Sequence, residues 1–218
     1  MLNIGISCRV TDAKDYFEER NSLSLDWISL FNRLNFFPIL IPNGISNLES
    51  FIDNCNLDGV ILSGGNNVNP KLYSSNDRLS SIYDIRDKSE FEIIEYCQKN
   101  NLPLIGICRG MFILNIFFRG GLSHNIKEHV NQNHKVKISR FNNYFNENKL
   151  VNSFHKQGIK KENISPNMDY FAISEDGIIE GIYNIENSFY GLQWHPERKP
   201  NDKQTERFMV DIFNKKIK

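Results

Sequence analysis

The sequence has no excess of either charge. Its 26 lysines and arginines balance 26 aspartates and glutamates, so the formal net charge is zero. A chain without a basic field lacks the electrostatic attraction that nucleic acids need, and it has no acidic tail either. No apolar run approaches the ~20 residues that cross a membrane. We therefore expect no nucleic-acid partner and no membrane partner.

Cysteine is also scarce, and its spacing excludes two common uses. The four cysteines, Cys8, Cys55, Cys97 and Cys108, form no CxxC pair and no zinc-binding pattern. The N-terminus lacks the basic start and long apolar segment of a secretory signal. We therefore expect reduced thiols in a cytoplasmic protein, with no metal and no organic cofactor.

Repeats, low-complexity linkers and domain boundaries are absent as well. A chain of 218 residues is long enough for a sizeable core, so we expect a single domain over 1–218. In the first half, strand patterns at 2–7, 37–41, 59–62 and 102–107 alternate with helical patterns at 22–34, 47–54 and 84–99. In the second half, strand patterns at 135–139, 170–174, 178–184 and 189–194 precede an amphipathic helix at 202–218.

These patterns predict an α/β fold. We expect three layers: a flavodoxin-like, mainly parallel sheet with helices on both faces, and an additional antiparallel β segment in the second half. Ligands of parallel sheets bind at the carboxyl ends of the strands. The loops 63–70, 108–109 and 195–197 should therefore converge.

The most informative segment runs from Gly106 to Gly110 and has Cys108 at its centre. It joins an apolar strand pattern to a second apolar run at 111–118. This is the G-x-nucleophile-x-G turn with cysteine in place of serine. Glycines on both sides relieve crowding at the strained turn, and the following helix N-terminus favours the thiolate. The alternative is a buried structural cysteine between two core elements.

A histidine and a glutamate stand two residues apart, 87 positions after the cysteine. Along a strand, residues i and i+2 point to the same side, so His195 and Glu197 should share one face, with Pro196 helping to end the strand. His195 can then accept the Cys108 proton while Glu197 orients the ring. A lone histidine beside a proline is more often a surface turn residue, but the pairing with the cysteine turn favours catalysis.

With these motifs the chain resembles class I glutamine amidotransferase domains, and more narrowly the free-standing γ-glutamyl hydrolases of peptidase family C26. The resemblance covers nearly the whole chain. Its further segments are 61–66, Arg86-Asp87 with Glu90, 151–157 and 191–197. It implies a triad of Cys108, His195 and Glu197, with oxyanion donors from the backbone N–H groups of Gly64, Gly65 and Arg109.

The resemblance also implies an activity. A cysteine-dependent hydrolase of this family cleaves a γ-glutamyl amide bond through a thioester and releases glutamate. We expect a small-molecule γ-glutamyl substrate as the partner, with a homodimer as a candidate assembly. The expected substrate-binding residues are Asn66, Phe112, Asn152, Ser153, Phe154 and His155.

Two of these residues need comment. Phe112 stands where amidotransferases of this class usually carry glutamine, so ordinary glutamine hydrolysis is in doubt. His155 competes with His195 for the role of base. We reject it as the base because no carboxylate follows two residues on, and we keep it as a site-lining residue, with simple loop packing as the alternative.

The segment Glu18-Glu19-Arg20, followed by Asp26-Trp27, points to one branch of the family. It resembles the branch that hydrolyses γ-glutamyl-CDP-amidate during phosphoramidate decoration of capsular polysaccharide. Its plain alternative is a solvated helix start. A basic residue can pair with the phosphates of a nucleotide diphosphate, and the candidates are Arg9, Arg20 and Lys71.

Three other functions stay open on the sequence alone. The first is hydrolysis of γ-glutamyl-γ-aminobutyrate in polyamine catabolism. The second is a glutaminase subunit that supplies ammonia to a synthetase. The third is a catalytically idle binding protein, which the intact set of cysteine, histidine and glutamate argues against.

Overall fold

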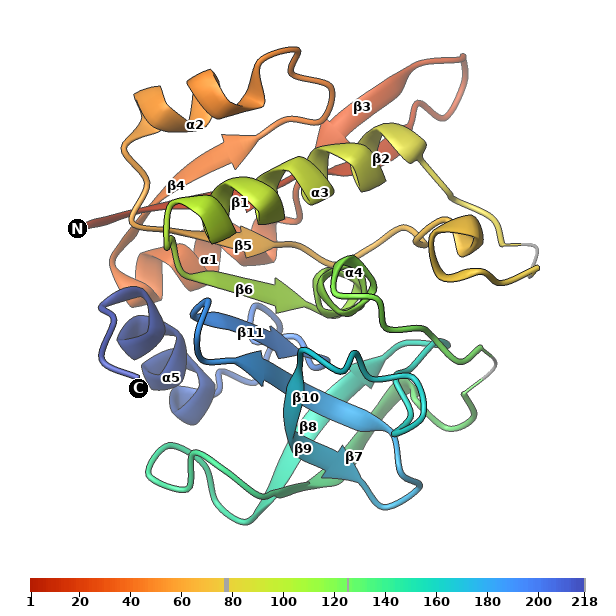
Figure 1. Ribbon diagram of the computed structural model, residues 1–218, viewed down its shortest axis with the longest axis vertical. Helices are drawn as coiled ribbons and strands as arrows, with labels where there is room; N and C mark the ends of the chain where they lie inside the picture. The colour runs from red at the N-terminus through yellow and green to blue at the C-terminus, as the bar shows by residue number, and fades with distance from the viewer. Residues whose placement is uncertain (77–78, 125, 218) are drawn as a thin grey trace.

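A computed structural model describes residues 1–76, 79–124 and 126–217. Its main feature is a nine-stranded sheet in the order β4-β1-β5-β6-β11-β10-β9-β7-β8 (Figure 1). The strands are β1 (Leu2–Ser7), β4 (Phe36–Ile41), β5 (Gly59–Leu62), β6 (Leu104–Ile107), β7 (Val130–Ile138), β8 (Asn148–Phe154), β9 (Asp169–Ser174), β10 (Ile179–Asn184) and β11 (Phe189–Leu192).

The sheet has a parallel part and an antiparallel part. Neighbours from β4 to β11 pair in parallel, and the chain order of these five strands across the sheet is 2-1-3-4-5. This is the flavodoxin-like order. From β11 onward, β10, β9, β7 and β8 pair antiparallel. Both parts of the predicted fold class are confirmed.

Helices cover both faces of the parallel part. They are α1 (Leu25–Leu34), α2 (Leu48–Cys55), α3 (Asp84–Lys99), α4 (Arg109–Phe117) and α5 (Lys203–Phe213), with a short 3₁₀ helix η1 (Pro70–Tyr73). One core cluster joins the sheet to α1 and α5, and the other joins it to α2, α3 and α4. In α1, the buried Trp27, Leu30 and Phe31 repeat at i, i+3 and i+4, which places one apolar face against the sheet.

Several boundaries differ from the sequence prediction. The stretch between the first strand and the helix predicted at 22–34, which includes Glu19 and Arg20, forms a hairpin of β2 (Arg9–Asp12) and β3 (Glu19–Ser22), and the helix begins at Leu25. Because β3 is exposed or half-buried along its length, it has no apolar alternation that would mark a strand. Strand β8 was not predicted, since its buried positions include Lys149 and Ser153. Strand β7 begins five residues earlier than predicted, and β11 ends two residues earlier.

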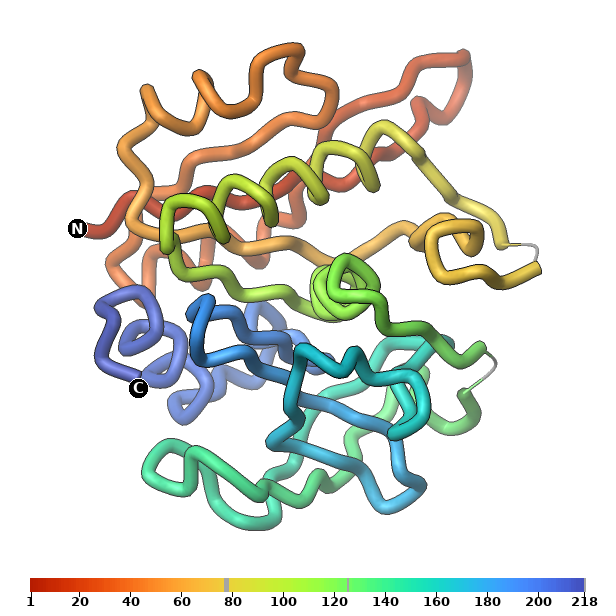
Figure 2. The backbone as a smooth tube through the Cα atoms, in the orientation of Figure 1, coloured from red at the N-terminus to blue at the C-terminus, as the bar shows by residue number. Residues whose placement is uncertain are grey.

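The C-terminal helix is also shorter than predicted. Helix α5 ends at Phe213, and Lys218, the last residue of the predicted helix, lies outside the described residues. Within the described ranges, no helix is both long enough and apolar enough to cross a membrane. Figure 2 places the two chain ends on the left of the view, whereas the arrows of β5 and β6 in Figure 1, drawn in the same orientation, point toward the right. The carboxyl ends of these strands carry the site described next.

Candidate active site

Cys108 lies at the turn between β6 and α4. Its backbone has φ 52° and ψ −104°, a conformation that residues other than glycine seldom adopt. The chain passes itself closely there. A Cβ at Gly106 would lie 2.3 Å from the Gly110 carbonyl oxygen, and a Cβ at Gly110 would lie 2.2 Å from the Leu62 carbonyl oxygen. The two glycines therefore allow the sharp turn that presents Cys108 above the sheet.

His195 and Glu197 form a short, buried contact. His195 Nδ1 lies 2.6 Å from Glu197 Oε1, and both side chains are about 95% buried. The pair is not on a strand, because β11 ends at Leu192. Strand alternation is therefore the wrong reason for their shared direction. The Asn152 side chain instead fixes the turn, accepting from His195 N at 2.8 Å and donating to His195 O at 2.9 Å.

Cys108 and His195 face the same space. A Cβ at Gly64 would lie 3.2 Å from His195 Cε1 and 3.5 Å from Cys108 Cβ, so Gly64 lies against both side chains. Burial lowers the pKa of His195, but the Cys108 charge and hydrogen bond, together with Glu197, outweigh it and raise the pKa to about 10. The Phe154 ring packs edge-on against His195. This environment favours the protonated form of His195.

The loop that carries Gly64 and Gly65 is held from below by Arg86. This fully buried guanidinium donates to the carbonyl oxygens of Ser63 at 2.8 Å, Gly64 at 3.2 Å and Gly65 at 2.5 Å. In a trans peptide the N–H points opposite to the C=O. The N–H groups of Gly64 and Gly65 therefore point away from Arg86, which is the orientation an oxyanion hole needs.

Arg86 belongs to a buried ion network that reaches the cysteine turn. Glu90 accepts from Arg86 Nε at 3.0 Å, from the Ser7 hydroxyl at 2.8 Å and from Arg109, which also donates to Asp87. Burial raises the pKa of Glu90, but the two guanidinium groups outweigh it and hold the pKa below its usual range. Burial lowers the pKa of Arg86 to about 10. The network ties the Gly64-Gly65 loop to the first residue of α4.

A cavity of about 280 Å³ opens beside Cys108. Four of the six predicted substrate-binding residues line it, namely Asn66, Phe112, Phe154 and His155. Asn66 is already engaged, since its amide bonds both N and O of Val10. Phe112 is almost fully buried.

The other two predicted substrate-binding residues do not line this cavity. Asn152 holds the main chain of His195, as described above. Ser153 is fully buried and its hydroxyl donates to the carbonyl oxygen of His129 at 2.7 Å. Of the two, Asn152 therefore positions a residue of the site.

Two further arginines lie at the site. Arg9 and Arg198 line a smaller cavity together with Gly65, His195 and Glu197. The Arg198 guanidinium lies 4.0 Å from the centre of the Phe154 ring. Arg9 was among the predicted cations, whereas Arg198 was not. Its place next to Glu197 in the sequence is the signal that could have identified it.

Several known proteins are similar to this chain in sequence. The chain is 32% identical over 199 residues to the γ-glutamyl-CDP-amidate hydrolase of Campylobacter jejuni, and the alignment covers 90% of each chain. It is 29% identical over 208 residues to the γ-glutamyl-γ-aminobutyrate hydrolase of Escherichia coli, covering 81% of this chain and 78% of that protein. A third alignment, with a protein of Schizosaccharomyces pombe, shows 36% identity over 160 residues and covers 65% of this chain and 62% of that protein.

A solved structure and a family model complete the comparison. A glutamine amidotransferase of Thermotoga maritima superposes with a TM-score of 0.64 at 18% identity, covering 100% of this chain and 87% of that chain, which establishes a shared fold. The family model described as peptidase C26 matches residues 3–197. The chain therefore belongs to the peptidase C26 family, the hydrolase family that its motifs indicate.

Proposed function

We propose that the protein hydrolyses a γ-glutamyl amide bond through a covalent thioester on Cys108. The thiolate attacks the γ-carbonyl carbon, and the protonated His195 gives its proton to the leaving nitrogen as the C–N bond breaks. His195 then takes a proton from water, whose oxygen attacks the thioester. The C–S bond breaks, and glutamate leaves with Cys108 restored.

The observation that carries this proposal is the arrangement of three side chains. Cys108 stands on a strained strand-to-helix turn, His195 faces it, and Glu197 lies 2.6 Å from the far ring nitrogen. Glu197 holds the ring and stabilises the imidazolium, as in other triads. The N–H groups of Gly64, Gly65 and Arg109 are the proposed donors to the tetrahedral oxyanion, and each such donor is typically worth ~10²–10³ in rate.

For the substrate, we assign γ-glutamyl-CDP-amidate, in the phosphoramidate decoration of capsular polysaccharide. Support comes from the Campylobacter jejuni relative, which aligns over 90% of both chains. Arg9 and Arg198 lie beside His195, where they can pair with phosphate groups of the leaving portion. Arg9 Nε is buried and, among the described residues, has no hydrogen-bond partner. The apolar Phe112 gives no amide to hold free glutamine.

The test compares glutamate release from three compounds: glutamine, γ-glutamyl-γ-aminobutyrate and γ-glutamyl-CDP-amidate. We expect kcat/KM for the nucleotide compound to exceed that for glutamine by at least ~10², which corresponds to about 3 kcal/mol. Cys108→Ser should abolish turnover of all three. Arg198→Gln should reduce turnover of the nucleotide compound much more than turnover of glutamine.

Each alternative has its own outcome. A preference for γ-glutamyl-γ-aminobutyrate would favour the function of the Escherichia coli relative. Equal rates on all three compounds would remove the substrate assignment and leave the thiol mechanism standing. Normal turnover by Cys108→Ala would overturn the mechanism itself.

A further inference from the structure

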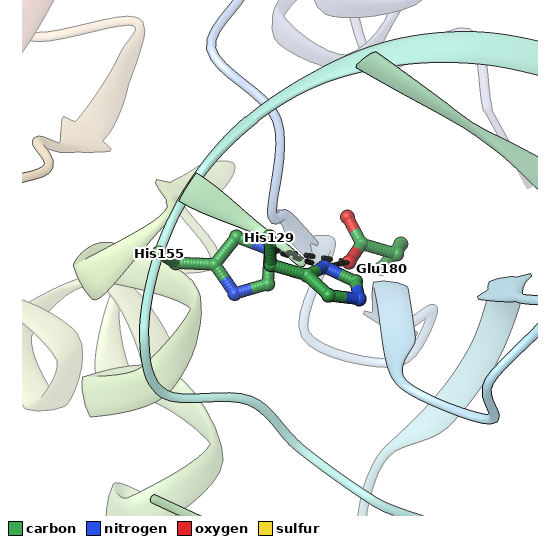
Figure 3. Close-up of side chains that lie close together, drawn as sticks. All are labelled: His129, His155 and Glu180. Atoms are coloured by element: carbon green, nitrogen blue, oxygen red, sulfur yellow. Dashed lines mark hydrogen bonds and ion pairs between the residues drawn. The ribbon is translucent and has the colours of Figure 1, made fainter. Parts of the chain in front are cut away.

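We propose that His129, His155 and Glu180, with His134 beside them, form a binding site for Zn²⁺ or a similar divalent transition-metal ion. The three side chains come from different segments: His129 precedes β7, His155 follows β8, and Glu180 lies in β10. Figure 3 shows them pointing toward one another. All three are at least 96% buried. The set is spread over residues 129–180, so no short sequence motif predicts it.

The distances between donor atoms match one face of a metal tetrahedron. His129 Nδ1 lies 3.2 Å from His155 Nε2 and 3.4 Å from Glu180 Oε1, and His155 Nε2 lies 3.3 Å from Glu180 Oε1. Zinc with ligands at about 2.0–2.1 Å in tetrahedral geometry separates neighbouring ligand atoms by about 3.3–3.4 Å. His134 Nε2 lies 3.5 Å from the same carboxylate oxygen but outside this close set of three ligand atoms, so water or a shifted His134 ring would supply the fourth ligand.

The outer contacts fix which ring nitrogen carries the proton. His155 Nδ1 lies 2.6 Å from the Gln157 carbonyl oxygen, and His129 Nε2 lies 3.0 Å from Asp176 Oδ2. Both partners are acceptors, so both nitrogens must donate. In the neutral rings, the lone pairs of His155 Nε2 and His129 Nδ1 therefore point at each other and at Glu180. Metal-binding histidines use this same arrangement, in which the second nitrogen donates to a carboxylate or a carbonyl.

Three converging lone pairs repel unless a positive charge lies between them. Neither Glu180 carboxylate oxygen makes a hydrogen bond of acceptable geometry with any described residue, and the same holds for both His134 ring nitrogens. A carboxylate buried without such bonds is costly. One extra proton on the histidines would relieve part of the repulsion, and a bound cation would relieve all of it.

The donor types select among cations. Imidazole nitrogen suits zinc and its neighbours in the transition series, whereas Mg²⁺ and Ca²⁺ prefer oxygen ligands. The ion can reach the site from solvent, because a cavity of about 400 Å³ is lined by His129, His134 and Asp176. Bound zinc would join β7, β8 and β10 and fix His155, which lines the cavity beside Cys108. The proposed hydrolysis needs no step at this ion.

The experiment measures Zn²⁺ binding by calorimetry after chelator dialysis. It uses Cys108→Ser protein, so that the thiol cannot hold the metal. We expect one equivalent with a Kd below about 1 μM. Glu180→Gln and His129→Asn should each weaken binding by at least about a hundredfold. His124→Asn, which removes a histidine outside the cluster, should bind as tightly as the parent, and Mg²⁺ should not compete.

Thermal unfolding gives a second measurement if a buried variant does not fold. Zn²⁺ at a hundred times its Kd should raise the Tm of the Cys108→Ser protein by roughly 5–10 °C. The proposal fails if this protein takes up no zinc, or if folded Glu180→Gln binds zinc as tightly as its parent. It also fails if His195→Asn, rather than Glu180→Gln, abolishes binding, because the ion would then lie in the catalytic cavity.

Discussion

Cys108 combines a reactive group with an unfavourable backbone. A residue other than glycine at φ 52° and ψ −104° costs of the order of 1–3 kcal/mol, so the surroundings must hold it there. They do so through close backbone packing, with Gly106 against Gly110 and Gly110 against Leu62. The strain is therefore stored at the residue proposed to react, and the two neighbouring glycines maintain it.

The first prediction concerns these glycines. Gly106→Ala should lower the free energy of unfolding by about 3 kcal/mol or more, because its Cβ would lie 2.3 Å from a backbone oxygen that cannot move aside. Gly121→Ala is the matched control, since its nearest neighbour is a side-chain nitrogen at 3.4 Å, and it should change stability by no more than about 0.5 kcal/mol. Urea unfolding measures both, and equal midpoints would contradict the packing argument.

The second prediction concerns the protonation of His195. Its folded-state pKa, near 10, is raised above the ordinary 6.5, so the imidazolium persists through neutral pH and is lost as the pH rises through about 10. If the imidazolium protonates the leaving nitrogen, kcat/KM should fall near pH 10. Glu197→Gln removes one cause of the raised pKa and should move this fall toward neutral pH. A pH–rate profile that does not move would exclude Glu197 from this role.

At the scale of elements, helix α3 has a polar buried face where an apolar one is usual. Arg86 and Glu90 lie on the same face as the apolar Ile93, Ile94 and Cys97 and are fully buried. The steps from Arg86 to Glu90, Ile93 and Cys97 are four, three and four residues, so these side chains share one stripe of the helix. The helix itself was predictable from its length and flanking turns. Its role was not, because a charge run on a helix usually marks a solvated face.

The third prediction tests this helix. Glu90→Gln leaves Arg86 and Arg109 without their shared carboxylate, and breaking a buried pair of this kind costs about 3–5 kcal/mol. Lys88→Gln is the control on the same helix, because its contact with Glu92 is 3.8 Å long and solvent-exposed, and it should change stability by less than about 0.5 kcal/mol. Urea unfolding measures the change in stability of both variants, and equal changes would contradict the prediction.

Activity provides an independent readout of the same pair of variants. Arg86 orients the Gly64-Gly65 loop. In a Glu90→Gln protein that still folds, kcat should therefore fall by a larger factor than KM rises. Lys88→Gln should keep both constants. A Glu90→Gln enzyme of normal kcat would mean that the network supports the fold alone.

For the whole molecule, the sequence predicted the parallel sheet better than its antiparallel extension. Buried strands such as β5 and β6 are continuous apolar runs that end in glycine-containing turns, so both their type and their position could be predicted from the sequence. Strand β8 was missed because it buries Lys149 and Ser153. The approach of the Cys108 turn to His195 followed from the parallel-sheet rule, whereas the cluster of His129, His155 and Glu180 depends on antiparallel pairing that sequence periodicity does not encode.

The final prediction compares the four cysteines of the chain. Burial raises the pKa of Cys8, Cys55 and Cys97, which disfavours their reactive thiolates. Cys108 instead lines the cavity beside His195, the residue proposed to hold its proton during the reaction. A low dose of iodoacetamide at neutral pH should therefore label Cys108 at least about tenfold faster than any other cysteine, as read by peptide mass spectrometry. In guanidinium chloride all four should label at similar rates, which controls for intrinsic reactivity. If the half-buried Cys55 reacts as fast as Cys108 in the folded protein, His195 does not activate Cys108 at neutral pH.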